Sequence, residues 1–193
     1  MGVSQSKYDR NYYLTNCDGY TQDGSLCGRL QTILSHIPNW SGMTVFDIGC
    51  GRGEVTKHLI SLGANVISTD YSYAAFDLFK DNNTDREVFI RTDVTNGFDW
   101  IKDSYFDVIV LADIVEHLYN NQLSILGKEA SRMTKSCGII LIDTPIMNGG
   151  ESELHVDIKE SAQEVQKYFP NTKIFNTHWY KKPEHCNIIL YKL

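Results

Sequence analysis

Short apolar runs alternate with stretches of helical periodicity along most of this chain. The runs are brief enough to be buried strands, and they cover residues 43–48, 65–69, 87–92, 106–112 and 138–142. Between them, apolar side chains recur at helical spacing after the first run, near residues 72–80 and over residues 118–135. Strands that alternate with helices in this way are typical of a mostly parallel sheet with helices on both faces. The pattern therefore predicts an α/β fold.

The two ends of the chain depart from this alternation. An apolar stripe over residues 25–37, ended by Pro38, predicts a helix before the first strand. After the fifth strand we expect a helix over residues 157–168 and two further strands, 172–175 and 186–191. About ten residues separate these last strands, so we expect them to pair as a terminal antiparallel hairpin.

Two polar segments have no counterpart in the alternating pattern. Residues 1–24 are rich in tyrosine, and they form either a loosely ordered terminus or a lid whose rings close over a ligand. Residues 145–153 are rich in Gly, Asn and Ser and form a candidate substrate loop. We expect one domain over residues 1–193, with an N-terminal lid and helix at 1–40 and a substrate-loop insertion at 144–158.

Composition narrows the function classes. The chain has 193 residues, 42% of them hydrophobic, and a net charge of -6, which argues against broad attraction to nucleic acid or anionic membrane. No apolar run approaches the roughly 20 residues of a membrane span, and the polar start is unlike a signal peptide. The five cysteines are scattered and contain no C-x-x-C pair. This usage favours a reducing cytoplasm over a disulfide framework or a zinc site.

A glycine-rich turn follows the first predicted strand. Asp47 stands at the strand's carboxyl end, where open α/β sheets bind ligands, and glycines follow at every second position. The dinucleotide fingerprint requires a glycine where Glu54 stands, and no Gly-Lys-Ser/Thr of a P-loop follows. A carboxylate here would repel a pyrophosphate. Asp47 and Glu54 suit a ligand that brings positive charge to the turn, as S-adenosylmethionine does with its ammonium and sulfonium, whereas NAD would bring its pyrophosphate.

Aspartates also follow the other predicted strands of the parallel sheet. Any one of them could simply cap a helix. Together they would lie on one rim, because the carboxyl ends of parallel strands meet at the same edge. The five residues are Asp47, Asp70, Asp93, Asp113 and Asp143. We interpret this rim as a binding site.

With these motifs, residues 40–193 resemble the class I S-adenosylmethionine-dependent methyltransferases. The segment VFDIGCGRGE resembles the first motif of that family, D-x-G-x-G-x-G. Asp70 in VISTDYS, Asp93 in RTDV and the segment FDVIVLADIVEHL match the motifs after the next three strands. The resemblance implies a Rossmann-like sheet of seven strands whose last strand is antiparallel, with S-adenosyl-L-methionine as cofactor.

The resemblance also implies roles for individual residues in cofactor binding. Asp70 would accept hydrogen bonds from both ribose hydroxyls, and Asp93 from the adenine amine while the Val94 amide donates to the ring. Tyr71 and Ile114 would cover the adenine faces. The methionine part would lie on the glycine backbone, with Asp47 near its ammonium. The cofactor-binding residues we expect are Tyr13, Asp47, Gly49, Cys50, Gly51, Asp70, Tyr71, Asp93, Val94, Ala112 and Asp113.

The fourth motif contains a candidate metal site. Asp113, Glu116 and His117 form D-x-x-E-H, and they would share a helix face if the helix began near Asp113. With the distal His155 they resemble the E-x-x-E-H pattern of two methyltransferase groups that hold a divalent cation. These groups act in the ubiquinone pathway and on the 3′-terminal 2′-hydroxyl of small RNAs. Asp113 replaces the first Glu with a shorter side chain. The donors suit Mg²⁺, Mn²⁺, Fe²⁺ or Zn²⁺.

Two versions of the chemistry follow from these residues. With a metal, the ion would bind the acceptor hydroxyl and lower its pKa. Without one, Glu116 would cap a helix, His155 would be a surface residue, and His117 would be the general base. The catalytic residues we expect are His117, Asp113 and His155. His178, Trp179 and His185 are interpreted as structural, and Cys50 has no visible activating partner.

The sequence therefore predicts a cytoplasmic methyltransferase that acts on an oxygen of a small polar molecule, with nitrogen as the second choice. The expected partner is a small-molecule acceptor rather than nucleic acid or membrane, and a homodimer is compatible with the sequence. One alternative is an RNA 2′-O-methyltransferase, against which the acidic charge counts. Another is a catalytically silent protein that keeps the cofactor pocket for regulation.

Overall fold

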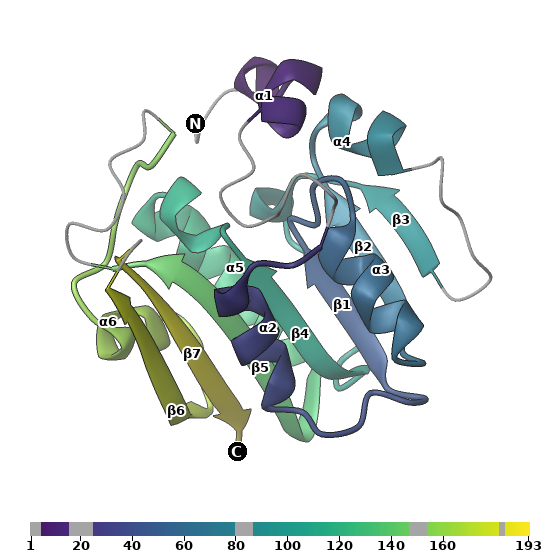
Figure 1. The fold of residues 1–193 in the computed structure, drawn as a ribbon. Helices are drawn as coiled ribbons and strands as arrows, with labels where there is room; N and C mark the ends of the chain where they lie inside the picture. Colours follow the sequence, from purple (N-terminus) through teal and green to yellow (C-terminus); the bar gives the residue numbers. More distant parts are fainter. Residues whose placement is uncertain (1–4, 16–24, 80–86, 147–153, 182–183) are drawn as a thin grey trace.

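A computed structural model describes residues 5–15, 25–79, 87–146, 154–181 and 184–193. Its centre is a seven-stranded sheet with the strand order β3-β2-β1-β4-β5-β7-β6 (Figure 1). The strands are β1 (Thr44–Ile48), β2 (Asn65–Asp70), β3 (Glu87–Arg91), β4 (Phe106–Ala112), β5 (Thr134–Pro145), β6 (Thr172–Lys181) and β7 (Glu184–Lys192).

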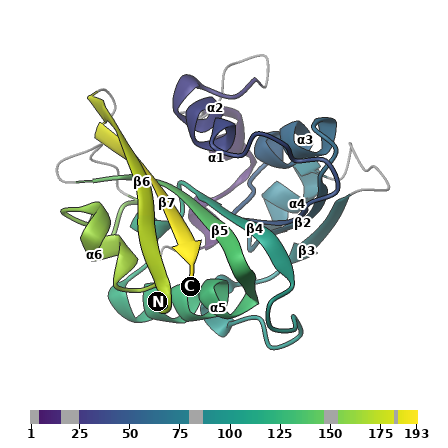
Figure 2. The ribbon, with the colours of Figure 1, turned by 90° about the horizontal axis from the view of Figure 1, so that it is seen from below.

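Helices cover both faces of this sheet. Figure 2 shows α2 and α3 on one face and α5 and α6 on the other. Their bounds, with those of three 3₁₀ helices, are η1 (Gln5–Lys7), α1 (Arg10–Thr15), α2 (Gly28–Ser35), α3 (Glu54–Ser61), α4 (Tyr73–Phe79), η3 (Val94–Asn96), η4 (Val115–His117), α5 (Asn120–Met133) and α6 (Ala162–Gln166). Each face buries its own apolar cluster, one around Leu30 and Leu59 and the other around Leu126 and Val165.

The direction of the strands confirms the predicted fold class. Strands β3, β2, β1, β4 and β5 are parallel, whereas β7 runs antiparallel to both β5 and β6. The chain passes outward from β1 to β2 and β3 and then returns to the other side of β1 as β4. The crevice between β1 and β4 is thus the topological switch point, where open α/β sheets bind ligands.

The terminal hairpin is larger than predicted. Strands β6 and β7 pair from Thr172↔Lys192 to Lys181↔Glu184, so the expected connection of about ten residues is wrong. Only residues 182–183 separate the two strands. Because β6 is an edge strand, it exposes Phe175 (73%) and Trp179 (49%), and its apolar side chains do not alternate as they do in a half-buried strand.

Two helices also differ from their predicted bounds. The helix expected to reach residue 135 ends at Met133, and β5 begins directly at Thr134. The helix expected over residues 157–168 spans only Ala162–Gln166, with Ser161 as its N-cap. Residues before it are held elsewhere, since the buried Lys159 donates to Asn120 Oδ1 over 2.7 Å and pairs with Asp157.

The described part of the N-terminal segment packs on the sheet edge. Helix α1 lies near α4 (Figure 1), and Tyr8 and Tyr13 are buried in a cluster with Ala75 and Leu154. This packing argues against a loosely ordered terminus for residues 5–15, and the lid that closes over a ligand stays a prediction. Residues 16–24 of this segment and residues 147–153 of the candidate substrate loop lie outside the described residues. Among the described helices, none has the length and apolar character that a membrane crossing requires.

Candidate active site

The glycine turn after β1 crosses the carboxyl end of β2. The amides of Gly49 and Cys50 both donate to the Thr69 carbonyl, over 2.8 and 3.0 Å. Gly49 has a φ of +76°, and an ideal Cβ at this position would lie 2.9 Å from Cδ1 of Ile114. A side chain here would therefore collide with the residue that covers the turn, which is why glycine is needed.

The third glycine of the motif has a different role from the expected one. Gly53 has a φ of +87° and is the N-cap of α3. A Cβ on this residue would overlap the ring of Phe79 in α4. Gly53 therefore allows α3 and α4 to approach each other, because the ring of Phe79 occupies the place that a side chain would take.

Asp70 is a buried hydrogen-bond acceptor at the end of β2. Its Oδ2 accepts from the Gly51 amide over 3.0 Å, and its Oδ1 accepts from the Ser72 amide over 2.9 Å and from the Tyr13 hydroxyl over 3.3 Å. Burial raises the pKa of Asp70, and these hydrogen bonds oppose the rise. Asp70 thus ties the glycine turn, the start of α4 and the N-terminal segment to one carboxyl group.

Asp47 is buried more deeply than direct contact with a ligand would require. The Thr56 hydroxyl lies 2.5 Å from its Oδ2 and 2.7 Å from the Ser68 hydroxyl. Burial raises the pKa of Asp47 to about 7. The second carboxylate proposed to meet a positive ligand, Glu54, pairs with Arg52 over 2.6 Å.

The remaining predicted cofactor residues surround the same crevice. Asp93 is exposed and caps η3, because its Oδ1 accepts from the Thr95 amide over 2.9 Å and from the Thr95 hydroxyl over 2.7 Å. Tyr71 is half-buried. Val94, Cys50 and Ala112 are buried, and burial raises the pKa of Cys50 well above its usual value. A thiol in this state is a poor nucleophile, in line with the absence of an activating partner in the sequence.

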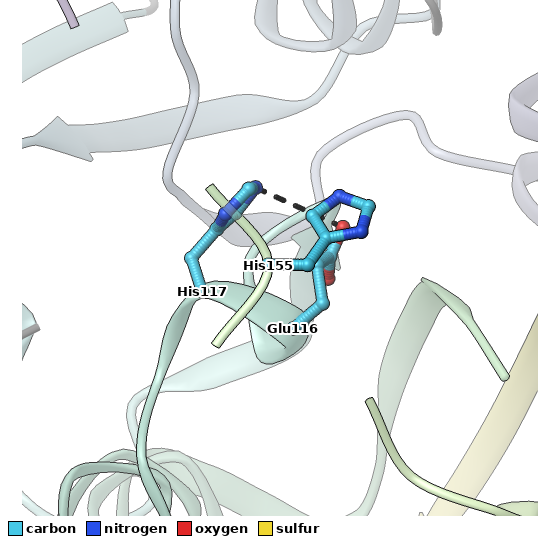
Figure 3. Close-up of side chains that lie close together, drawn as sticks. All are labelled: Glu116, His117 and His155. Atoms are coloured by element: carbon cyan, nitrogen blue, oxygen red, sulfur yellow. Dashed lines mark ion pairs between the residues drawn. The ribbon is translucent and has the colours of Figure 1, made fainter. Parts of the chain in front are cut away.

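Glu116, His117 and His155 form a second group, beyond the end of β4. One ligand atom from each of the three side chains lies within 4.8 Å of the others. Figure 3 shows the three side chains converging, with Glu116 Oε1 3.9 Å from His117 Nε2. The carboxylate of Glu116 is buried, and its Oε2 accepts from the Thr144 hydroxyl over 2.9 Å.

The segment that carries His155 is fastened to this group by backbone contacts. The Val156 amide donates to the Glu116 carbonyl over 2.9 Å, and His117 Nδ1 lies 2.9 Å from the Leu154 carbonyl. A carbonyl oxygen only accepts, so Nδ1 of a neutral His117 carries the proton and Nε2 keeps its lone pair. Nε2 is the nitrogen on the side of Glu116. His117 is therefore held in the tautomer that a base or a metal ligand requires.

Asp113 does not join this group. It has a φ of +54° and precedes the 3₁₀ helix, which begins only at Val115, so the expectation of one shared helix face is wrong. Arg29 holds its carboxylate through two hydrogen bonds, of 3.0 and 2.7 Å. The same guanidinium pairs with the buried Asp143. His185 Nδ1 lies 3.6 Å from Asp113 Oδ1 and 3.5 Å from Asp143 Oδ2. The cation that faces Asp113 is thus an arginine of the protein.

Comparison with known proteins decides the family. A sequence profile described as a methyltransferase domain matches residues 46–142, which is half of the chain. The chain belongs to the class I S-adenosylmethionine-dependent methyltransferases. The matched region begins in β1 and ends in β5, so it contains the glycine turn, Asp70 and the Glu116–His117 pair.

Curated relatives are similar to parts of this methyltransferase. The chain is 34% identical over 101 residues to the ubiquinone biosynthesis O-methyltransferase of Pelagibacter ubique, which covers 52% of the chain and 41% of that protein. It is 26% identical over 126 residues to the protein of the same name from Bradyrhizobium diazoefficiens, which covers 65% of the chain and 49% of that protein. The aligned regions span less than half the length of these two relatives.

A solved structure with the same fold covers nearly the whole chain. Magnesium protoporphyrin IX methyltransferase from Synechocystis, solved with bound S-adenosylmethionine, superposes with a TM-score of 0.69 at 15% identity. The match covers 99% of this chain and 98% of that one. At this identity the likeness shows the fold.

Several residues of this methyltransferase site were missed in the sequence. Arg29 lies within the apolar stripe of α2, three residues after Leu26, and a lone cation at such a position signals a buried ion pair. Thr144, which holds Glu116, follows Asp143 in β5 and therefore points to the opposite face of the sheet. Tyr8 reaches the site across more than a hundred residues of sequence, and no local pattern could reveal its partner.

Proposed function

We propose that this chain transfers the methyl group of S-adenosylmethionine to a hydroxyl oxygen of a small polar molecule. The observation that carries the proposal is the fixed tautomer of His117, whose Nε2 lone pair lies beside Glu116 in a group next to the cofactor crevice. The names of the relatives, ubiquinone biosynthesis O-methyltransferases, support oxygen as the acceptor atom. Among small molecules, a quinone-like phenol is our first choice.

The crevice between β1 and β4 would hold the cofactor. Asp70 would receive the ribose, and Asp93 with the Val94 amide would receive the adenine, whose faces Tyr71 and Ile114 would cover. The methionine part would lie along the glycine turn near Asp47. Gly49, Cys50, Gly51, Ala112 and Tyr13 would complete the walls. Ile114 covers Gly49 and Tyr13 covers Gly51, so two of the side chains expected to contact the cofactor already lie against this turn.

The residues of the second group would prepare the acceptor. His117 Nε2 would take the proton of the acceptor hydroxyl, and the resulting oxygen would attack the methyl carbon in line with the departing sulfur. The carbon–sulfur bond breaks, and S-adenosylhomocysteine leaves as the neutral thioether. Such a displacement depends mainly on alignment and on a deprotonated acceptor. The hydrogen bond from Nδ1 to the Leu154 carbonyl would stabilise the imidazolium that forms.

The same residues fit a divalent cation. Glu116, His117 and His155 offer one oxygen and two nitrogens within 4.8 Å of one another, a donor set that suits Mg²⁺, Mn²⁺, Fe²⁺ or Zn²⁺. The Thr144 hydroxyl orients Glu116 and the Leu154 carbonyl orients His117, as hydrogen-bond partners of metal ligands usually do. A cation held there would act as a Lewis acid and lower the pKa of the acceptor hydroxyl. Asp113 would take no part, because Arg29 holds it.

A transfer assay with labelled S-adenosylmethionine tests the proposal. The acceptors are catechol, 2-aminophenol, a monosaccharide and a short single-stranded RNA, each with EDTA and with each of the four metals. We expect label on a catechol oxygen and its loss in His117→Gln. Label on nitrogen or on RNA would overturn the choice of acceptor. Binding of S-adenosylhomocysteine without any transfer would support a silent cofactor-binding protein. Full activity in EDTA would show that transfer needs no metal and would support His117 as the general base.

A further inference from the structure

Tyr8 lies between the cofactor crevice and the Glu116–His117–His155 group. Its ring is buried and stands 5.4 Å from the ring of Tyr71, next to Asp70, and 5.8 Å from the ring of His117 (centroid distances). The centroid of the His117 ring also lies 5.2 Å from that of the His155 ring. The imidazole thus contacts one aromatic ring from the N-terminal segment and one from the segment after β5.

The backbone of Tyr8 is anchored independently of these ring contacts. The Ser72 hydroxyl donates to the Tyr8 carbonyl over 2.7 Å, while the Ser72 amide donates to Asp70 over 2.9 Å. Asp9 then starts α1, since its Oδ1 accepts from the Tyr12 amide over 2.8 Å. The position of Tyr8 is therefore set by the end of β2, where the cofactor ribose would bind.

His117 needs a second constraint besides its hydrogen bond. The Nδ1–H···O bond to Leu154 holds one ring atom, but a single hydrogen bond leaves the imidazole some freedom to rotate about its Cβ–Cγ bond. The Tyr8 ring is perpendicular to the imidazole, with an interplanar angle of 90°. Perpendicular aromatic pairs are favoured over arbitrary angles. Tyr8 therefore opposes that rotation and keeps Nε2 directed at Glu116.

The hydroxyl of Tyr8 is suited to this place because it stays uncharged. Burial raises the pKa of Tyr8, and the neighbouring tyrosines and the carboxylates of Glu116 and Asp70 raise it further. The side chain is a neutral phenol throughout the pH range in which an imidazole can act as a base. It adds no negative charge that would hold a proton on Nε2.

We propose that Tyr8 is a positioning residue for methyl transfer, which orients the His117 ring from the N-terminal segment and so couples the cofactor crevice to the acceptor site. The inference rests on the proposed role of His117. It assigns a task to an aromatic side chain outside the family's matched region, which begins at residue 46. The ring carries the effect, and the hydroxyl does not.

Three variants separate this role from simple packing. Tyr8→Phe keeps the ring, Tyr8→Leu keeps an apolar side chain of smaller area, and Leu14→Ala alters an exposed position of helix α1, which follows Tyr8 in the chain. With catechol as acceptor, we expect Tyr8→Leu to lower kcat between about ten- and a hundred-fold, as small misplacements of reacting groups do. Tyr8→Phe and Leu14→Ala should keep kcat, and none of the three should change the affinity for S-adenosylhomocysteine more than slightly.

A second readout does not depend on turnover. The Hε1 proton of His117, assigned by its disappearance in His117→Gln, should sit in the ring current of residue 8. In proton NMR spectra, we expect the chemical shift of this proton to be unchanged in Tyr8→Phe and Leu14→Ala. In Tyr8→Leu we expect the shift to change and the line to broaden. An unmoved resonance in a folded Tyr8→Leu, or an unchanged kcat, would overturn the proposal. If the wild-type chain transfers no methyl group, the proposed function is wrong. The chemical shift of the His117 proton then decides by itself whether Tyr8 orients His117.

Discussion

The hydroxyl of Tyr13 lies 3.3 Å from Oδ1 of Asp70, the carboxylate that would receive the cofactor ribose. A carboxylate offers about four acceptor positions. The amides of Gly51 and Ser72 and the Tyr13 hydroxyl already use three of them. Two ribose hydroxyls need two positions, so the cofactor has to displace the Tyr13 hydroxyl to be bound by both.

Tyr13→Phe removes this competition and keeps the ring over Gly51. We expect S-adenosylhomocysteine to bind up to about fivefold more tightly, which corresponds to about 1 kcal/mol for one hydrogen bond. Isothermal calorimetry measures the change, and Leu14→Ala in the same helix is the control with unaltered affinity. Weaker binding in Tyr13→Phe would mean that the hydroxyl itself contacts the cofactor.

The pH dependence of stability should carry the signature of Asp47. Its pKa is raised by burial from 3.8 to about 7. A group whose pKa is higher in the folded state stabilises the fold fully below its unfolded pKa, and this contribution is lost as the pH rises through the folded pKa. The loss falls between pH 3.8 and about 7 and amounts to a few kcal/mol, on the order expected for a shift of this size.

Asp47→Asn should abolish that loss, since asparagine is neutral at every pH. We expect the variant and the wild type to have similar melting temperatures near pH 4. As the pH approaches 7, the melting temperature of the variant should rise above that of the wild type. Asp107 provides a control of opposite sign. Partial burial raises its pKa, but hydrogen bonds from Lys135 and Thr44 outweigh this and lower it. Asp107→Asn should therefore be less stable than the wild type at neutral pH, and the two melting temperatures should converge in acid.

Most of the fold could be predicted from the sequence because the central parallel strands β1 and β4 are buried on both faces. Strand β4 is apolar at every position except Asp107, and such runs are visible without knowledge of their partners. The edge strand β6 shows the converse. Its exposed Phe175 and polar Asn176 face solvent, so the pattern stops at residue 175 although the backbone ladder continues to Lys181.

The site was predictable only where the chain itself fixes the geometry. Asp70 follows its strand, and Glu116 and His117 are adjacent, so motif spacing found them. The placement of Asp113 could not be found this way, because its backbone turns to a positive φ and a guanidinium from α2 takes its carboxylate. The positive φ has no local signal, and although Arg29 stands out as a lone cation in an apolar stripe, nothing in the sequence indicates that its partner lies 84 residues away.

Arg29 should be essential for stability, since it faces two carboxylates at the switch point. Arg29→Met leaves the buried Asp143 and the partly buried Asp113 without their cation. Removing one member of a buried pair costs about 3–5 kcal/mol. Urea unfolding measures the loss. Adding Asp143→Asn to Arg29→Met should restore part of it, because one uncompensated charge is removed. Equal stability of the single and double variants would show that the charges are not the cause.

Thr144 should matter for chemistry more than for folding. Its hydroxyl donates to Glu116 Oε2 over 2.9 Å and thereby fixes the carboxylate beside His117. Loss of such an orienting partner typically costs ten- to a hundred-fold in activity or metal affinity, as estimated roughly from other sites. We expect Thr144→Val, which preserves shape, to lower methyl transfer to catechol by about that factor.

Thr134 is the matched control because it lies in the same strand and is also buried. Its hydroxyl donates to the Ala130 carbonyl over 2.7 Å, at the opposite end of β5 from the site. Thr134→Val should lose stability comparable to one hydrogen bond, about 1 kcal/mol, and keep its activity. Parallel losses of activity in both variants would show that disturbing β5 is enough to impair transfer. A loss confined to Thr144→Val would tie the chemistry to the orientation of Glu116.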